Sequence, residues 1–317
     1  MPWETELDPS TRAVEQDVPT LLRAGVRVLT EAGVPSPDAD AAALLAHAWE
    51  VDETDLSRRR LFSDAVPAEV AAGFARLVAE RARRIPLQHL TGVAHFRRLS
   101  LRVGPGVFVP RPETELLVTE VLDHLAHGDD GAPPLVVDLC SGSGAIALSV
   151  ALEHPGVRVI GIEREAPALS WSQSNLVDFD LGASTVDLLA GDATTVAVDH
   201  PELAGTVDVV VTNPPYVPDA AVPRDPEVRD HDPAAALYGG ASGLELPALL
   251  IAQAVVLLRP GGLFVMEHAE DQGAGVREIV AGTPGLSGAA TFPDYTGRDR
   301  YTVARRDSAA SPMRNGE

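Results

Sequence analysis

The stretch LVVDLCSGSGAIALSVA, residues 135–151, decides the fold of this chain. Its first five residues are mostly apolar and predict a short buried strand that ends close to Asp138. A turn with Gly142 and Gly144 follows, and an apolar helix is predicted from Ala145. Glycines in such a turn let the backbone approach a ligand closely, and a helix N-terminus offers free N–H groups. We therefore expect a cofactor that carries a nucleoside to bind over this turn.

Strand and helix patterns alternate on the C-terminal side of this stretch. The further predicted strands are RVIGIE (158–163), VDLLAG (186–191), VDVVVTN (207–213), LFVMEH (263–268) and a final pair at 288–297 and 299–306. Helical patterns separate most of the earlier strands. Such alternation is typical of an α/β fold with a mostly parallel sheet and helices on both faces, a Rossmann-like architecture.

The N-terminal part of the chain has a helical pattern instead. A predicted helix at 20–33 places Leu22 and Leu29 on one face, and two further helices are predicted at 36–51 and 67–84. Together they predict a small helical bundle.

These patterns divide the chain into parts. Alternating apolar and polar residues around turn signals predict a hairpin, and polar, aperiodic sequence at both ends predicts disorder. We expect a frayed N-terminus at 1–17, a helical domain at 18–88, a β-hairpin connector at 89–111, the α/β domain at 112–306 and a disordered tail at 307–317.

Composition and charge exclude several classes of function. The chain has 46 acidic and 25 basic residues, a formal net charge of −21, which disfavours a free nucleic acid partner because phosphates are repelled at long range. Every basic residue is arginine, which excludes chemistry that needs a lysine amine. The single cysteine, Cys140, excludes a disulfide framework and a multi-cysteine metal site, and we expect no metal. No long apolar run is present, so we expect a cytoplasmic protein that does not enter a membrane.

Acidic residues at the ends of the next two strands point to the same ligand. Glu163 ends the second strand, where an acid binds ribose hydroxyls, and Asp192 follows the third strand, where it could face an adenine amino group. Two interpretations compete: an NAD-dependent oxidoreductase, and a methyltransferase that uses S-adenosylmethionine. The dinucleotide pattern prefers a third glycine where this chain has Ala147. Asp138, just before the turn and placed to hold the amino group of the cofactor, favours S-adenosylmethionine.

The sequence TNPPYV, residues 212–217, ends the fourth strand abruptly. Two consecutive prolines fix φ and supply no N–H, so the backbone between Asn213 and Tyr216 is rigid. The side-chain oxygen of Asn213 and the carbonyl oxygen of Pro214 could accept the two N–H bonds of a planar –NH₂ group, while Tyr216 packs on its plane. The motif therefore predicts methyl transfer to such a nitrogen.

Several longer stretches carry a resemblance to one family. They are PLQHLTG (86–92), GVFVPRPETELLV (106–118), DLCSGSGAIALSVA (138–151), TNPPYV (212–217), EVRDHDPAAALYGGASGLE (227–245), LRPGGLFVMEHAEDQG (258–273) and DYTGRDRYTVARR (294–306). In them the chain resembles the peptide chain release factor N5-glutamine methyltransferases, the PrmC/HemK family. The Asn-Pro-Pro-Tyr motif alone is shared with DNA adenine-N6 and RNA guanine-N2 enzymes, whereas PRPETELLV and ALYGGASGL in register with it are highly specific.

The resemblance implies a class I S-adenosylmethionine-dependent methyltransferase domain behind a helical domain and a hairpin. It also implies N5-methylation of the glutamine in the Gly-Gly-Gln loop of bacterial class 1 release factors. We expect in-line transfer with S-adenosylhomocysteine as product, and docking of the release factor on the helical domain. The implied catalytic residues are Asn213, Pro214 and Tyr216, and the implied substrate contacts are these together with Pro215 and Phe108. The implied cofactor contacts are Asp138, Cys140, Ser141, Gly142, Ser143, Gly144, Glu163, Asp192, Ala193 and Asn213.

Three residues depart from the family pattern. Cys140 stands where many relatives have glycine, Glu163 where most have aspartate, and Ala193 where some have an aromatic residue. These departures bear on cofactor affinity and leave the acceptor site untouched, and no step requires Cys140 as a nucleophile. Arg111 and Glu113 can be interpreted as a catalytic acid and base, but an ion-paired lid that ties the hairpin to the cofactor crevice is favoured.

Two other functions stay open. An amino-methyltransferase acting on a nucleic acid base, adenine N6 or guanine N2, shares the Asn-Pro-Pro-Tyr motif but predicts a basic groove or an added recognition domain. A non-catalytic protein that binds S-adenosylmethionine would not need an intact acceptor motif. The chain favours neither.

Overall fold

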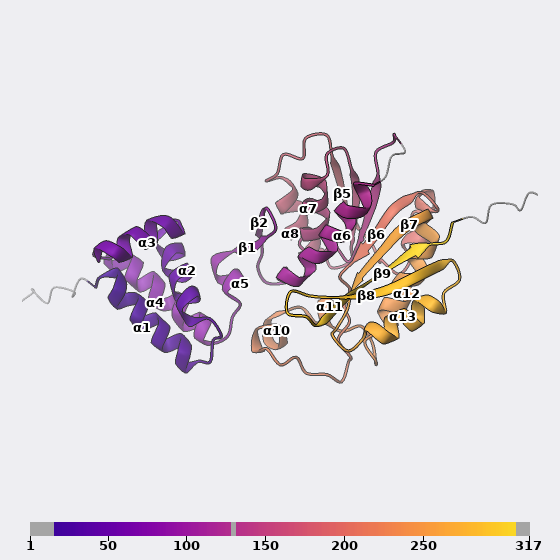
Figure 1. Ribbon diagram of the computed structural model, residues 1–317. Coiled ribbons are helices and arrows are strands. Elements are labelled where there is room, and N and C mark those ends of the chain that lie inside the picture. The colour runs from indigo at the N-terminus through magenta and orange to yellow at the C-terminus, as the bar shows by residue number, and fades with distance from the viewer. Residues whose placement is uncertain (1–15, 128–130, 309–317) are drawn as a thin grey trace, which may run out of the picture. The chain divides into compact units, whose positions relative to one another are not determined.

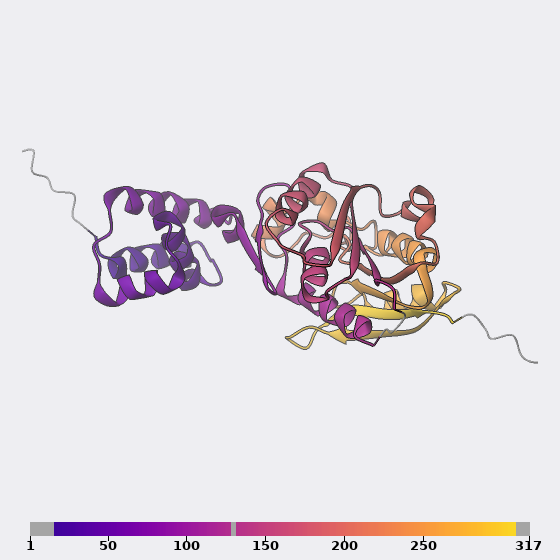
Figure 2. The same cartoon turned by 90° about the horizontal axis from the view of Figure 1, so that it is seen from above.

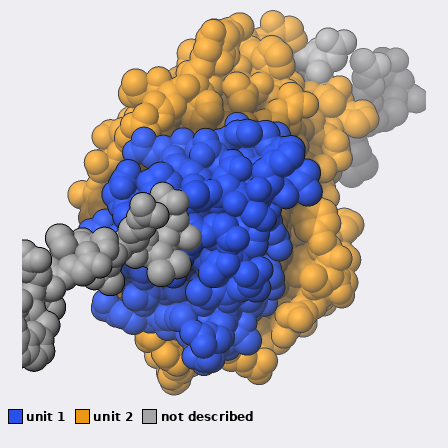
Figure 3. Space-filling view, turned by 90° about the vertical axis from the view of Figure 1, so that its left-hand side faces the viewer, with its two compact units in different colours: residues 1–92 blue, residues 93–317 orange. Residues whose placement is uncertain are grey.

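The computed structural model describes residues 16–127 and 131–308. The chain forms two compact units, 1–92 and 93–317, which Figure 3 shows in different colours.

The two ends predicted to be disordered, 1–17 and 307–317, lie almost entirely outside the described residues. At their inner ends, Asp17 forms a β-bridge with Ala65, and the N–H of Asp307 donates to a backbone carbonyl at 2.9 Å.

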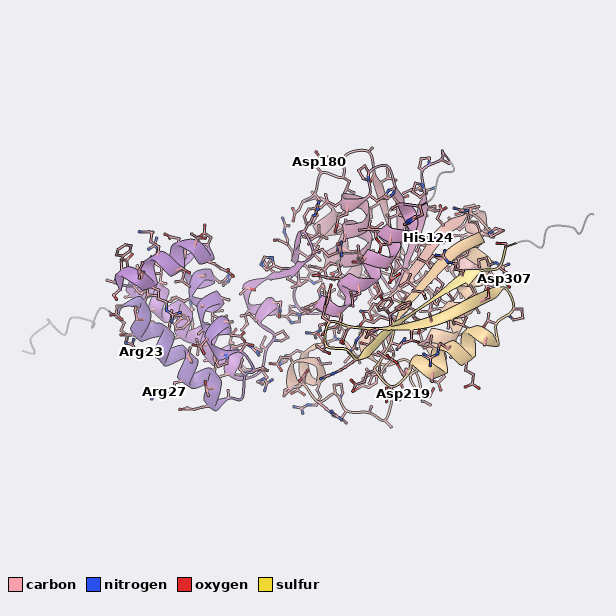
Figure 4. The ribbon with its side chains drawn as sticks, in the orientation of Figure 1. Arg23, Arg27, His124, Asp180, Asp219 and Asp307 are labelled. Atoms are coloured by element: carbon pink, nitrogen blue, oxygen red, sulfur yellow. The ribbon has the colours of Figure 1, made fainter. Side chains whose placement is uncertain are left out.

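The first unit is a bundle of helices. They are α1 (Val18–Glu31), α2 (Pro37–Trp49), α3 (Glu53–Phe62), α4 (Ala68–Ala82) and α5 (Leu87–Thr91). Leu22 and Leu29 of α1 are buried in one cluster with Phe74 of α4, whereas Arg23 and Arg27 lie on the exposed side of α1 (Figure 4). The buried apolar stripe predicted from the sequence therefore holds the bundle together.

A buried ion pair ties two helices of this bundle. Arg81 of α4 donates from Nε to Asp40 of α2 at 2.7 Å, and both side chains are nearly inaccessible to solvent. A buried pair of this kind is costly to break from one side, because the remaining charge is left without its partner.

A short hairpin opens the second unit. Strands β1 (Val93–Phe96) and β2 (Leu99–Arg102) pair antiparallel, with Phe96 opposite Leu99. Both of these side chains are buried in the core of the α/β unit. The hairpin thus occupies part of the connector predicted at 89–111.

A seven-stranded sheet forms the centre of the second unit. Its strands are β3 (Leu135–Leu139), β4 (Arg158–Glu163), β5 (Thr185–Ala190), β6 (Val207–Thr212), β7 (Leu258–Glu267), β8 (Leu286–Pro293) and β9 (Asp299–Arg306). They lie in the order β5-β4-β3-β6-β7-β9-β8. Strands β3 to β7 pair in parallel, and β9 pairs antiparallel with both β7 and β8. The predicted mostly parallel α/β sheet is confirmed.

Helices cover both faces of this sheet (Figures 1 and 2). The helical segments of this unit are η1 (Pro112–Thr114), α6 (Glu115–Leu125), α7 (Ala145–Glu153), α8 (Ala166–Leu176), α9 (Val196–Asp199), η2 (Pro201–Leu203), α10 (Pro226–His231), α11 (Ala234–Leu237), α12 (Glu245–Leu257) and α13 (Gly273–Ala281). Successive residues of β6 pack on opposite faces: Val209 belongs to the cluster of Leu117 in α6, and Val210 to that of Leu250 in α12.

The order of the strands reverses at β3. Strands β4 and β5 continue on one side of it, and β6 and β7 lie on the other. In open α/β sheets, ligands bind outside the carboxyl ends of the strands at such a switch point. The fold therefore brings the turn after β3 and the TNPPYV loop after β6 to the same place.

Three details differ from the sequence predictions. Helix α3 has no counterpart among the predicted helices, because only Leu56 of its ten residues is buried and no apolar periodicity results. Strand β7 begins at Leu258 and not at 263, because Leu258 pairs with Val207 across an irregularity in the register. The short helices α10 and α11, in the insertion between β6 and α12, also have no counterpart among the predicted helices.

Candidate active site

One cavity in the second unit brings the two predicted halves of the site together. The predicted site residues that line it are Phe108, Cys140, Ser141, Gly142, Ser143, Glu163, Asp192, Ala193, Asn213, Pro214, Pro215 and Tyr216. Arg111 and Thr114 line it from the segment after the hairpin, and residues of α10 and α11 line it from the insertion. The lining does not include Asp138 or Gly144.

The glycine-rich turn has an unusual backbone. Cys140, Gly142 and Gly144 all have positive φ, at 63°, 56° and 82°. The turn is closed by the Gly144 N–H, which donates to the Ser141 carbonyl at 2.8 Å. Gly144 is the N-cap of α7 and carries no side chain to cap it. The first N–H groups of α7 thus lie next to the cavity, where a polar or anionic group of a ligand can use them.

Glu163 and Asp192 frame the turn from the ends of β4 and β5. Glu163 accepts the Gly142 N–H at 2.8 Å on one oxygen and the Glu165 N–H at 2.8 Å on the other. Asp192 accepts both the N–H and the hydroxyl of Thr194 on Oδ1, and these hydrogen bonds lower the pKa of its carboxyl. Both acids are therefore held in fixed orientations beside the cavity, and a carboxylate retains lone pairs for ligand hydroxyl or amino groups.

Asp138 lies beneath the turn and not on the cavity surface. Its Oδ2 accepts the Ala147 N–H at 3.2 Å, and it is fully buried. Burial raises the pKa of this carboxyl to about 8. Its observed contact is thus with the first turns of α7, and its direct contact with a cofactor stays a prediction.

Two buried oxygens near the turn have no hydrogen-bond partner in the protein. They are Oδ1 of Asp138 and Oγ of Ser141, and Ser141 lines the cavity. Unpaired buried polar atoms are costly unless a ligand or water satisfies them. With the glycine turn and the two framing acids, this donor and acceptor set fits a nucleoside cofactor with an amino acid tail, such as S-adenosylmethionine.

Asn213 is held from one side at the end of β6. Its Nδ2 donates to Oγ1 of Thr114 at 3.1 Å, and Thr114 in turn donates to Oε2 of Glu267 at 2.7 Å. Glu267 ends β7, the neighbour of β6 in the sheet. With Nδ2 engaged, Oδ1 is the end of the Asn213 amide that is left to accept a hydrogen bond from a ligand.

Tyr216 is fixed by contacts at both its hydroxyl and its backbone. The hydroxyl donates to Oε1 of Glu267 at 3.3 Å, and Gln272 donates from Nε2 to the Tyr216 carbonyl at 2.8 Å. Burial, and then the charge of Glu267, raise the pKa of the Tyr216 phenol, so it stays protonated near neutral pH. A neutral, rigidly held ring can serve as a wall of the acceptor site.

Arg111 forms an ion pair with a residue of the insertion after β6. Its guanidinium lies 2.8 Å from Asp232 and packs over the ring of Phe108 at 4.9 Å. Burial raises the pKa of Asp232 to about 6 despite the neighbouring Arg111. The pair connects the segment after the hairpin to the insertion after β6. These contacts support a structural role for Arg111, whereas the role of Glu113 stays a prediction.

Cys140 is a poor candidate for a nucleophile. Burial raises the pKa of its thiol to about 12, and the nearby carboxyls of Glu163 and Asp138 add to this shift. Only the thiolate is strongly nucleophilic, so Cys140 is unreactive near neutral pH. Cys140 instead lines the cavity, and its backbone has the left-handed conformation.

Sequence reasoning missed three residues that hold the acceptor loop: Thr114, Glu267 and Gln272. A signal existed for the first two, since Thr114 follows Pro-Glu in a family-specific stretch and Glu267 is a charged residue at the carboxyl end of a buried strand. Their distance along the chain from Asn213 hid the contact.

A sheet of this order, a cofactor turn after its first strand and an Asn-Pro-Pro-Tyr loop in the same cavity define a class I, Rossmann-like methyltransferase. Comparison with known proteins agrees. The PrmC N-terminal domain family matches residues 20–92, and the Methyltransferase small domain family matches residues 103–225.

Relatives of known name extend the match over almost the whole chain. The release factor glutamine methyltransferase of Bifidobacterium longum is 45% identical over 282 residues, covering 87% of this chain and 95% of that protein. The protein of the same name from Streptomyces coelicolor is 46% identical over 280 residues, covering 88% and 94%. The chain belongs to the release factor glutamine methyltransferase family.

Among solved structures, a chain of the E. cuniculi Mtq2–Trm112 complex, responsible for methylation of the eRF1 translation termination factor, is 21% identical with a TM-score of 0.43. The match covers 64% of this chain and 99% of that chain. A likeness this distant carries no argument about substrate. Within residues 16–127 and 131–308, no group of three or more His, Cys, Asp or Glu could hold a metal ion. No helix among those residues is long and apolar enough to cross a membrane.

Proposed function

We propose that this methyltransferase methylates N5 of the glutamine in the Gly-Gly-Gln loop of class 1 release factors, with S-adenosylmethionine as methyl donor. The observation that carries the proposal is the position of Asn213 and Pro214, at the end of β6 in the same cavity as the glycine-rich turn. The relatives, which are named release factor glutamine methyltransferases, supply the substrate class.

In this proposal the cofactor half of the cavity binds and the acceptor half orients. The turn at 140–144, which includes Ser141, would hold the amino acid tail of the cofactor. Glu163 and Asp192 would hold its ribose and adenine. S-adenosylmethionine, when bound, supplies an electrophilic methyl group on a positively charged sulfur.

The acceptor residues prepare a weak nucleophile. An amide nitrogen has a delocalised lone pair, so it must be aimed at the methyl carbon to react. Asn213 Oδ1 and the Pro214 carbonyl would accept hydrogen bonds from the two N–H groups of the substrate amide. Tyr216 and Phe108 would pack against this planar group. The nitrogen would form its bond to the methyl carbon as the carbon–sulfur bond breaks, with S-adenosylhomocysteine as the leaving group, and the surplus proton would pass to water.

An assay with several acceptors tests this function. Purified protein with radiolabelled S-adenosylmethionine would be offered a release factor, the same factor with its loop glutamine changed to alanine, and duplex DNA. We expect label in the intact release factor only. Label in DNA and none in the release factor would favour the nucleic acid alternative and overturn the proposal.

We propose further that the helical unit is the docking platform for the release factor. Leu61 and Phe62 of α3 are 78% and 68% exposed, and exposed apolar side chains of this size are often contact sites. Changing both to serine should raise KM for the release factor and leave the affinity for S-adenosylmethionine unchanged. Val177→Ser, at an equally exposed position of the other unit, serves as the control. An unaltered KM in the double variant would count against this platform.

A further inference from the structure

The hydrogen bonds behind Asn213 form a chain with a direction. Asn213 donates to Thr114, and Thr114 donates to Glu267. A hydroxyl has one hydrogen, so a Thr114 that has given it to Glu267 can only accept from Asn213. A carboxylate can only accept, so the direction of the whole chain follows from the charge of Glu267.

The direction of this chain decides which end of the Asn213 amide faces the cavity. With Glu267 ionised, Nδ2 is drawn to Thr114 and Oδ1 is left for the substrate. If residue 267 could itself donate to Thr114, the hydroxyl could turn its hydrogen to Oδ1. The Asn213 NH₂ would then face the NH₂ of the substrate, where two donors meet and no hydrogen bond forms.

We propose that Glu267 is a positioning residue that sets the orientation of the Asn213 amide through Thr114. The inference rests on the proposed function, because it assigns Oδ1 the role of acceptor for the glutamine amide. Glu267 is 2% exposed and is absent from the cavity lining, so it acts only through its neighbours.

The surroundings of Glu267 keep its two oxygens occupied. Thr114 donates to one and the Tyr216 hydroxyl to the other, so the same carboxylate holds both the partner of Asn213 and one wall of the acceptor site. Among the charged groups around it, Arg300 of β9 lowers the pKa of the carboxyl, and Glu113 of η1 raises it. Burial is the largest influence and raises the pKa of Glu267 to about 7.

A pKa near this value makes the positioning by Glu267, and hence kcat, depend on pH. Below about pH 7 the carboxyl of Glu267 takes up a proton and gains the ability to donate to Thr114. Arg300 stays charged and the Tyr216 hydroxyl stays neutral throughout this range. Of these three groups, Glu267 is therefore the one whose protonation state changes. We expect kcat of the unaltered protein to fall as pH falls through about 7.

Glu267→Gln is the decisive variant. Glutamine keeps the shape of the side chain and can pair with both hydroxyls, but its NH₂ can donate to Thr114. We expect kcat to fall roughly tenfold or more, the size of one oriented polar contact. The affinity for S-adenosylmethionine, measured by calorimetry, should stay unchanged, and the fall of kcat below about pH 7 should disappear.

A second pair of variants keeps the test valid if Glu267→Gln folds poorly. Thr114→Ser retains the hydroxyl and should retain turnover, whereas Thr114→Val removes it and should lose turnover to a similar extent. Thr302→Val removes another buried hydroxyl, one that contacts His268 outside the site, and should lower stability without changing kcat. Urea unfolding of all four variants separates stability from catalysis.

The two proposals fail in different ways. Glu267→Gln with kcat and pH profile like the unaltered protein would overturn the positioning role, since a purely structural Glu267 predicts that result. Equal turnover of Thr114→Val and Thr114→Ser would do the same. If the unaltered protein leaves release factor unlabelled in the acceptor assay, the proposed function fails, and the inference fails with it.

Discussion

The cofactor half and the acceptor half of the cavity are built in different ways. In the cofactor half, the site is formed by the backbone turn at 140–144, and Glu163 holds this turn by accepting one of its N–H groups. In the acceptor half, side chains fix one another across long stretches of chain: Asn213 lies 99 residues from Thr114, and Thr114 lies 153 residues from Glu267. The difference predicts that changes in the first half alter cofactor affinity, and changes in the second alter turnover.

Apart from changes at Asn213 itself, the largest effect is expected at a glycine that packs closely against the acceptor loop. A Cβ added at Gly239 would lie 2.4 Å from the carbonyl oxygen of Pro215, a contact that the backbone must relieve by moving. Since a misplacement of about 1 Å can cost about a hundredfold in rate, we expect Gly239→Ala to lower kcat by that order. Steady-state kinetics with release factor, alongside calorimetry with S-adenosylmethionine, measures the two halves separately.

Gly73→Ala is the matched control for this change. Gly73 lies in α4, and the nearest atom to an added Cβ is 3.7 Å away, an ordinary contact. This variant should keep full activity and gain about 0.5–1 kcal/mol of stability, as alanine does inside helices. Normal turnover in Gly239→Ala would show that the acceptor loop does not depend on this close approach.

The next effect is expected in the cofactor half. Glu163→Ala removes the acceptor for the Gly142 N–H and the proposed ribose contact. We expect the affinity for S-adenosylmethionine to fall about tenfold, roughly 1.4 kcal/mol, with kcat at saturating cofactor little changed. The opposite pattern, lower kcat with unchanged affinity, would contradict the division of the cavity into one half that sets cofactor affinity and one that sets turnover.

The smallest effect on catalysis is expected from Asp138→Asn. This variant should instead change how the stability of the protein depends on pH. The pKa of Asp138 is raised from 3.8 to about 8 by burial, so its stabilising contribution is present at low pH and is lost as pH rises through about 8. The asparagine variant cannot ionise. Its unfolding free energy should therefore decline less than that of the unaltered protein between about pH 5 and about pH 9. Parallel curves in urea unfolding would contradict a buried, titrating carboxyl.

Local patterns explain which parts of this molecule can be predicted from its sequence. The strand, glycine turn and helix at 135–151, and the rigid loop after β6, follow from residues that are neighbours in the chain. Helix α3 escapes prediction because it buries only Leu56 and has no apolar period. The partners of Asn213 escape it for another reason, since no local pattern reports that η1 and the end of β7 meet behind the loop.

The same reason explains why the observed contacts of two predicted residues could not be read from the sequence. Asp138 has the residue type and spacing of a cofactor contact, yet its side chain turns beneath the loop to Ala147. Arg111 pairs with Asp232, 121 residues away, because the insertion after β6 and the segment after the hairpin line the same cavity. Sequence spacing places a residue at the correct strand end, but packing decides where its side chain points.

The most direct test of the account is the division of effects in Asn213→Ala. We expect kcat to fall on the order of a hundredfold or more, about 3 kcal/mol for one oriented polar contact, with the dissociation constant of S-adenosylmethionine within about threefold of its original value. Turnover of release factor that is unchanged in this variant would contradict the central claim that Asn213 positions the amide that receives the methyl group.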